Sequence, residues 1–198
     1  MIRKIALLMA AVAFSLLFAG CADTVIVAET LQQPLNGKIY TKCNIWYENP
    51  GKISAINIQK GKILPFGTEV ELANATSNSL LFETTIIFKD KTGNAYTIKF
   101  DNQLMMITPQ AYLTQIFTLD DKAKMTAGLS PELIAKLEKG IVTPGMTKRE
   151  VLLAYGTPAI FRTPSTTNST WIYWIDDEKT IRVVFNADKV KTILNLNE

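Results

Sequence analysis

The chain contains no histidine, and only two of its 198 residues are cysteine. Without an imidazole, a Ser-His-Asp triad, a Cys-His pair and every zinc site that uses a histidine ligand are excluded. The sequence also lacks a GxGxxG fingerprint and a phosphate-binding P-loop. A hydrophobic fraction of 47% with 20% charged residues is that of a folded globular protein, so a disordered chain is excluded as well.

The longest apolar run lies at the N-terminus and is too short to span a membrane. Arg3 and Lys4 precede it, and residues 5–19 are apolar except for Ser15. This run of about 15 residues falls short of the roughly 20 that a helix needs to cross the hydrocarbon core. A positive start, a short apolar run and small residues at its end are typical of a secretory signal. We therefore expect residues 1–20 to be a cleaved signal peptide.

The signal ends in Leu-Phe-Ala-Gly-Cys at residues 17–21, which resembles the lipobox of bacterial lipoproteins. The resemblance implies that Cys21 is acylated and becomes the first residue of the mature protein; an ordinary signal cleaved after Gly20 is the alternative. Each buried CH₂ contributes about 0.8 kcal/mol, so three acyl chains would hold the protein firmly on a membrane. The resemblance also implies sorting to the outer membrane, because Ala22 follows the cysteine where an aspartate would indicate the inner membrane.

Opposite charges nearly balance in the mature chain. Without Arg3 and Lys4, the 21 basic residues become 19, against 18 acidic ones. A protein that binds nucleic acid needs a basic surface, so nucleic acid is excluded as a partner. If Cys21 is acylated, Cys43 has no disulfide partner, and we interpret it as a buried core residue. No metal or cofactor is expected, because the acidic turn at 176–178 lacks the spaced oxygen ligands of a calcium loop.

Short strands separated by turn residues fill the first part of the mature chain. Asn-Pro-Gly at 49–51 and Pro-Phe-Gly at 65–67 are strong turn signals. Apolar and β-branched segments between the turn signals predict strands at 25–27, 38–47, 53–58, 68–73, 81–88 and 95–100. This pattern is typical of a small barrel or sandwich, and the segment 61–70 is weakly similar to bacterial SH3-like domains. We expect an all-β SH3-like domain at 38–104, preceded by a lipidated tether at 21–37.

Three helix-start signals follow, and their residues are Thr108-Pro109, Ser130-Pro131 and the capping box from Thr147 to Glu150. The first predicts a helix within a connecting segment, 105–129, whose polar stretch at 118–128 we interpret as a linker. The other two predict helices that end at glycines, and three strands are expected after them, at 171–175, 180–186 and 189–194. Turns this short predict an antiparallel meander. The domain at 130–198 would thus have two helices and a three-stranded sheet, and the whole chain would be α+β.

Five short segments of this domain share a characteristic order and spacing: GMTKREV at 145–151, GTP at 156–158, WIYW at 171–174, VVF at 183–185 and KV at 189–190. Together they resemble the SmpA/OmlA (BamE-like) lipoprotein domain over about residues 131–194. The resemblance implies two helices packed on a three-stranded sheet. It also implies a non-catalytic envelope protein, since the smallest members of that family assist the insertion of β-barrels into the outer membrane.

The strand at 171–175 is apolar on both faces. Its odd positions are expected to face the helices, whereas Ile172 and Trp174 lie on the other face, with Val184 and Ile193 as expected neighbours. One face of such a sheet is normally solvated, so an apolar second face needs a cover. The cover is either the N-terminal domain or a partner protein.

The sequence therefore predicts a lipid-anchored, non-enzymatic binding or scaffold protein of the bacterial envelope, with a role in outer-membrane biogenesis or integrity. Its partners would be membrane lipid, through Cys21, and an envelope protein, and the face of Ile172, Trp174 and Val184 is a candidate interface either with that partner or with the N-terminal domain. The alternative is a periplasmic module that binds the cell wall (peptidoglycan) or a small ligand in an aromatic groove around Trp46 and Tyr47. An enzyme would need a pair of acids in a cleft, which the sequence does not show.

Overall fold

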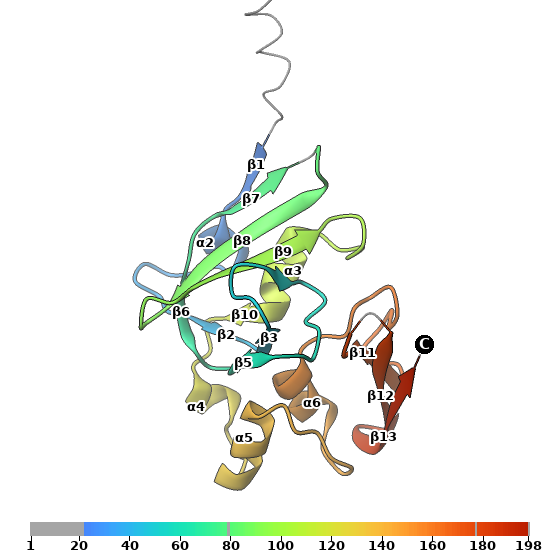
Figure 1. Ribbon diagram of the computed structural model, residues 1–198. Helices are drawn as coiled ribbons and strands as arrows, with labels where there is room; N and C mark the ends of the chain where they lie inside the picture. The colour runs from blue at the N-terminus through green and yellow to red at the C-terminus, as the bar shows by residue number, and fades with distance from the viewer. Residues whose placement is uncertain (1–21, 79, 177, 198) are drawn as a thin grey trace, which may run out of the picture.

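The computed structural model describes residues 22–78, 80–176 and 178–197. The expected signal peptide and Cys21 lie outside the described residues. The chain is a mixed α+β protein made mostly of strands, as the sequence predicted (Figure 1). A large curled sheet comes first, and small helices and a three-stranded antiparallel sheet follow. No helix in the described ranges is long and apolar enough to cross a membrane.

The curled sheet has the form of a half-barrel, and its described strands are β1 (Ala22–Val25), β2 (Ile39–Thr41), β4 (Ile53–Ser54), β6 (Glu69–Leu72), β7 (Ala75–Asn78), β8 (Glu83–Asp90), β9 (Ala95–Asp101) and β10 (Phe117–Thr118). The long strand β8 pairs with β6 and β7 along one edge and with β9 along the other. The short β4 pairs parallel with β9, and the other pairings of this sheet are antiparallel. A separate antiparallel pair joins β3 (Ile45–Tyr47) to β5 (Lys62–Leu64).

The hairpin of β8 and β9 has the predicted alternation. Tyr96, Ile98 and Phe100 are buried, so one face of β9 points into the curl. Helix α3 (Pro109–Ile116) lies inside the curl and completes this larger core with three buried side chains, Tyr112, Leu113 and Ile116 (Figure 1). Thr108 caps α3, as predicted, by accepting the Ala111 N–H.

The expected strand at 38–47 is broken into β2 and β3, which belong to different sheets. The break occurs because Asn44 leaves the large sheet and donates its backbone N–H to the Leu153 carbonyl at 2.9 Å. The expected strand at 53–58 is only two residues long, since a turn follows in which Asn57 has a left-handed backbone with φ of 58°. Neither the bond from Asn44 to Leu153 nor the left-handed backbone of Asn57 is visible in a local pattern of apolar residues.

Residues assigned to a tether and a linker are part of the folded structure. β1 pairs with β7, and helix α2 (Val27–Thr30) replaces the end of the strand expected at 25–27. Val25 and Val27 are buried in the larger core. Within the polar stretch 118–128, β10 ends beside β2, and α4 (Lys122–Met125) begins with an aspartate cap. The polar residues of that stretch are thus turn and cap residues.

The C-terminal part has the predicted order of elements. Helices α5 (Pro131–Glu138) and α6 (Lys148–Tyr155) precede a meander whose strands are β11 (Thr170–Trp174), β12 (Lys179–Asn186) and β13 (Lys189–Asn197). Ser130 caps α5 by accepting the Leu133 N–H, and the capping box of Thr147 and Glu150 is present at the start of α6. A second core lies between these helices and one face of the sheet, and Phe66 enters it from the turn after β5.

Candidate functional site

The Gly-Met-Thr segment at 145–147 has a structural role. Met146 is buried in the second core, and its carbonyl accepts the Val190 N–H at 2.7 Å. The Gly145 N–H donates to the Val190 carbonyl at 2.8 Å. Thr147 then starts α6 with its capping box. The segment therefore fastens the start of α6 to the start of β13, and these backbone groups are not available to a ligand.

The helix-facing side of the C-terminal sheet packs against the second core through its aromatic residues. Trp171 is 0% exposed and Tyr173 is 3% exposed, as the alternation predicted. The Tyr173 hydroxyl donates to the Gly156 carbonyl at 2.9 Å. The Lys148 ammonium lies 5.4 Å from the centre of the Trp171 ring and donates to carbonyls of the 166–168 loop. This face supports the fold.

The opposite face of the sheet, which we term the second face, carries the predicted apolar residues. Ile172, Trp174 and Val184 are each half-buried. The strand register places Ile172 beside Arg182 and Trp174 beside the buried Thr180. A cationic side chain therefore lies in the middle of a mainly apolar surface.

Strand β13 contributes leucines to the second face. Ile193, which we expected there, lies on the opposite face. The register of β12 and β13 shifts at a bulge, where Lys191 is the extra residue. The extra residue reverses the alternation of side chains along β13 after the bulge. Ile193 therefore lies on the same side of the sheet as Val190 and packs against the second core. Leu194 and Leu196 take the second face and are 43% and 36% exposed. We define the second-face patch as Ile172, Trp174, Val184, Leu194 and Leu196.

Part of the cover over Trp174 comes from the connection between α6 and β11. The guanidinium carbon of Arg162 lies 5.4 Å from the centre of the Trp174 ring, a cation–π contact. The Thr163 hydroxyl accepts the Ile172 N–H at 3.0 Å. From the N-terminal part, the Gln59 backbone N–H donates to the Trp174 carbonyl at 2.7 Å. Both chain parts thus reach the edge of the second-face patch while its side chains stay half-buried or exposed.

Trp46 and Tyr47 point in different directions from β3. The Tyr47 ring meets the Tyr96 ring edge to face, with the centroids 5.6 Å apart, and packs against the larger core. The Trp46 ring lies against Gly140, where a Cβ atom would collide with the indole. Both residues line one open cavity of about 220 Å³. They share a cavity wall, but their rings do not form a common stacking surface.

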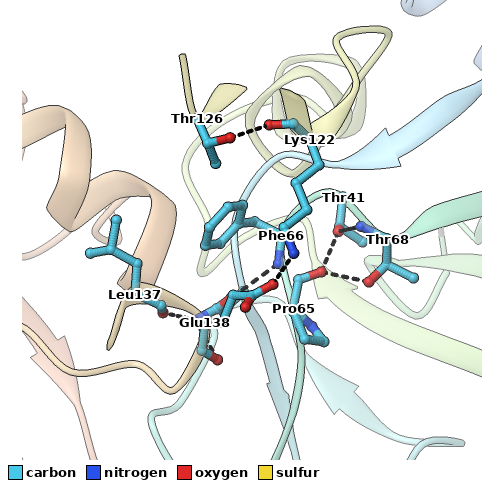
Figure 2. A network of polar contacts seen from close by, with 9 residues as sticks. Thr41, Pro65, Phe66, Thr68, Lys122, Thr126, Leu137 and Glu138 are labelled. Atoms are coloured by element: carbon cyan, nitrogen blue, oxygen red, sulfur yellow. Dashed lines mark hydrogen bonds and ion pairs between the residues drawn. The ribbon is translucent and has the colours of Figure 1, made fainter. Parts of the chain in front are cut away.

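A buried asparagine joins the N-terminal and C-terminal parts. Asn44, which is 0% exposed, donates through Nδ2 to the Leu137 carbonyl at 2.7 Å and accepts the Phe66 N–H at 3.0 Å. Leu137 is in the last turn of α5, and its carbonyl also accepts the Gly140 N–H at 2.9 Å. Figure 2 shows this junction, with Phe66 and Leu137 near the ion pair of Lys122 and Glu138.

The turn that carries Phe66 is fixed by two threonines (Figure 2). The Thr41 hydroxyl donates to the Pro65 carbonyl at 2.7 Å and accepts the Thr68 N–H at 3.0 Å. The Thr68 hydroxyl donates to the same carbonyl at 2.7 Å. Gly67 has a φ of 75° and faces Lys122, so a side chain there would be strained and crowded. The Pro-Phe-Gly-Thr segment therefore builds the junction.

A second set of side-chain amides holds the end of α6. The Asn57 Nδ2 atom donates to the carbonyls of Asn44 and Tyr155, each at 2.9 Å. The Gln59 Nε2 atom donates to the Tyr155 carbonyl at 3.3 Å. Side chains from the β-rich part thus cap the C-terminal ends of both α5 and α6.

Cys43 lies at this junction between two cavities, of about 280 and 370 Å³. Burial raises the pKa of the Cys43 thiol to about 12, although the Lys42 charge acts in the opposite direction. The thiol is therefore protonated at neutral pH and is not a nucleophile. Its prediction as a core residue is confirmed. In the described part of the chain, no three His, Cys, Asp or Glu side chains gather as metal ligands would.

Comparison of the chain with protein-family models, with curated proteins and with solved structures finds no match. Sequence reasoning missed the part that Arg162, Leu194 and Leu196 play in the second face. The alternation of Leu194, Asn195 and Leu196 in the sequence indicates a strand with one apolar face. The bulge decides on which side of the sheet that face lies, and the sequence gives no sign of the bulge.

Proposed function

We propose that this protein is a lipid-anchored, non-catalytic protein-binding module of the bacterial cell envelope, held on the periplasmic side of the outer membrane. Its binding surface is the second-face patch. The observation that carries the proposal is this apolar surface on one sheet face, with Arg182 between Ile172 and Leu194 in the register. Exposed apolar patches that contain aromatic residues mark protein-interaction sites.

The chemistry of the patch suits an interface anchor. Tryptophan and arginine are the residue types most often found at binding hot spots. The Arg162 guanidinium is already stacked on the Trp174 ring, so a partner would meet a pre-organised pair and order fewer side-chain rotamers on binding. Leu194 and Leu196 extend the apolar surface away from this pair along β13.

Sequence features support the envelope assignment. The lipobox-like residues 17–21 support anchoring through Cys21. The order of α5, α6 and three antiparallel strands is the one that a resemblance to SmpA/OmlA lipoproteins implies for residues 131–194. The buried, protonated thiol of Cys43 supports a non-catalytic role. A scaffold function in outer-membrane biogenesis or integrity follows from these features together.

The cavity beside Trp46 and Tyr47 favours a second candidate, the binding of peptidoglycan fragments or a small ligand by an SH3-like N-terminal part. Tyr47 is engaged with Tyr96, and Trp46 lies against Gly140, so the two rings do not offer a ligand one continuous stacking surface. We therefore place this function after protein binding.

Photo-cross-linking in cells tests the proposal. A photoactivatable amino acid replaces Leu194 on the second-face patch or, as a control, Ile87, which is 44% exposed on β8. We expect a discrete protein adduct from position 194 and none from position 87. Trp174→Ala should reduce the adduct strongly, because loss of a hot-spot residue costs about 2 kcal/mol or more of binding free energy, while Trp46→Ala should leave it. Equal adducts from both positions, or none from 194, would contradict the proposal.

A further inference from the structure

One end of the curled sheet brings the expected anchor close to exposed apolar loops. The register pairs Ala22 with Asn78, Asn78 with Glu83, and Glu83 with Asp101. These residues form a single row across β1, β7, β8 and β9 at the end of the sheet. Cys21 directly precedes this row in the sequence. In Figure 1 the row lies at the top of the molecule, where β1 begins.

Two loops extend from this row and expose large apolar side chains. Leu80, Leu81 and Phe82, between β7 and β8, are 67%, 71% and 51% exposed. Leu104 and Met106, which follow β9, are 42% and 67% exposed. We term these five residues the apolar tip. A cluster of this kind on a protein surface marks a contact with another molecule or with a membrane.

Hydrogen bonds join the two loops to one another. The Asn102 N–H donates to the Phe82 carbonyl at 2.7 Å. The Thr84 hydroxyl donates to the Asn102 side-chain oxygen at 2.9 Å. The Thr84 side chain is 0% exposed, so this link is held within the sheet. The two loops therefore lie side by side at this end of the sheet.

Polar side chains fix the turn at the start of each loop, and in the second loop Met105 is also buried in the larger core. The Asn78 Oδ1 atom accepts the N–H groups of Leu80 and Leu81, at 3.0 and 3.1 Å. The Asp101 Oδ1 atom accepts the N–H groups of Gln103 and Leu104, each at 2.8 Å. Such local bonds fix a turn without using its apolar side chains. The leucines are thus free to contact something outside the chain.

The backbone is strained at the two loops. Phe82 has a φ of 50° and Met106 a φ of 55°. Bulky residues other than glycine rarely adopt this left-handed region. Strained backbone of this kind is found often at functional sites.

The adjacency of Cys21 and Ala22 in the sequence indicates what the tip meets. One residue spans at most about 3.6 Å of extended chain, so an acylated Cys21 would hold Ala22 within a few ångströms of the lipid headgroups. The other strands of the row follow at about 4.8 Å each, so the loops that extend from the row are within reach of the interfacial region. A lipid surface is therefore the occupant that the geometry favours.

We propose that the apolar tip inserts into the bilayer interface beside the acylated Cys21. The proposal rests on the lipid anchoring put forward above. Insertion of apolar side chains to about 5–10 Å is the depth typical of interfacial segments. Three acyl chains already supply the affinity, so the tip sets the orientation. In Figure 1 the C-terminal sheet lies farther from the start of β1 than the loop between β7 and β8 does.

Depth-dependent quenching tests the insertion. The full-length lipoprotein is purified from membranes with Leu81→Cys or Met106→Cys, labelled with an environment-sensitive fluorophore, and reconstituted in phosphatidylethanolamine–phosphatidylglycerol vesicles that contain brominated acyl chains. Leu35→Cys is the matched control, because Leu35 is 94% exposed in the loop between α2 and β2, away from the row. Cys43 is 2% exposed and escapes labelling in the native state. We expect several-fold stronger quenching at 81 and 106 than at 35.

A second variant tests whether the tip acts as one unit. With the fluorophore at 106, Leu80→Asp combined with Leu81→Asp should lower the quenching to the level of position 35. Both leucines are more than half exposed, so these changes leave the fold intact.

The outcomes separate this inference from the anchoring on which it rests. Mass spectrometry of the purified protein first shows whether Cys21 carries acyl chains; their absence overturns the anchoring and the insertion together. If the protein is acylated and vesicle-bound but positions 81 and 106 are quenched no more than 35, insertion is refuted and anchoring stands. Shielding of the probes that depends on protein concentration, in detergent without lipid, would identify a second copy of the chain as the occupant and refute insertion as well.

Discussion

The junction between the two parts of the chain depends on Asn44, and replacing it is the sharpest test of the structure. Asn44→Ala removes the donor to the Leu137 carbonyl and the acceptor of the Phe66 N–H, while the backbone of residue 44 keeps its own bonds. The buried Phe66 N–H is then left without its partner, whereas the Leu137 carbonyl keeps the bond that it accepts from the Gly140 N–H at 2.9 Å.

The size of the effect follows from those two groups. A buried polar group left without a partner costs about 1–3 kcal/mol and the loss of an ordinary hydrogen bond about 1 kcal/mol, so the loss should be about 3 kcal/mol. The contact from Nδ2 to the Glu138 carbonyl, at 3.5 Å, is too long to add to this figure. A domain is stable by about 5–15 kcal/mol, so the variant should lose a substantial part of its stability.

Urea unfolding followed by circular dichroism measures the change, using the chain from residue 22 onward. Asn186→Ala is the matched control, because Asn186 is exposed at the end of β12, and it should change the unfolding free energy by less than about 0.5 kcal/mol. A loss for Asn44→Ala that is as small as the control would refute the view that this side chain holds the parts together.

A second variant, Asn44→Asp, tests whether stability changes with pH in the direction that the contact predicts. The introduced carboxyl faces the Leu137 carbonyl, and burial disfavours its charged form, so its folded pKa is raised above the unfolded value of about 3.9. The protonated form can donate to that carbonyl. Because the folded pKa is the higher one, the variant should be most stable below about pH 4 and should lose stability as the pH rises through the folded pKa. A deficit relative to the parent that does not change with pH would contradict the assigned contact.

Two further predictions concern single side chains. Thr147→Ala should cost about 1 kcal/mol through loss of the cap on α6, and urea melts that superimpose on those of the parent would show that the capping box adds nothing. Cys43 should resist iodoacetamide in the native protein near neutral pH and react once urea unfolds the chain, because burial raises its pKa to about 12 from the ordinary value of 9.0. Since the folded pKa is the higher one, the stabilisation by the neutral thiol should be complete below about pH 9 and fall above it; fast native labelling would contradict this.

Local signals were sufficient wherever short-range physics decides the structure. The caps at Thr108, Ser130 and Thr147 were correct, because an N-cap bond spans only three residues. The hairpin of β8 and β9 and the C-terminal meander were correct because alternation and short turns are also local. The two faces of β11 were assigned for the same reason.

The predictions failed where a distant group decided the outcome. The strand expected at 38–47 is interrupted because Asn44 bonds to Leu153, more than a hundred positions later in the chain. Ile193 changed faces because a bulge at Lys191 altered the register, and no residue type announces such a bulge. The polar stretch 118–128 looked like a linker because cap and turn residues have the same composition as a loop.

By itself, the sequence determined the class of the fold, the caps, the C-terminal meander and the absence of imidazole chemistry, since each depends on composition or on neighbours within a few residues. Only the tertiary structure decided that Phe66 enters the second core and that Asn44 caps α5. It also decided that the loops of the apolar tip lie in one row with Ala22. These features depend on strand register and on contacts between residues far apart in the chain, and a pattern read along a single segment contains neither.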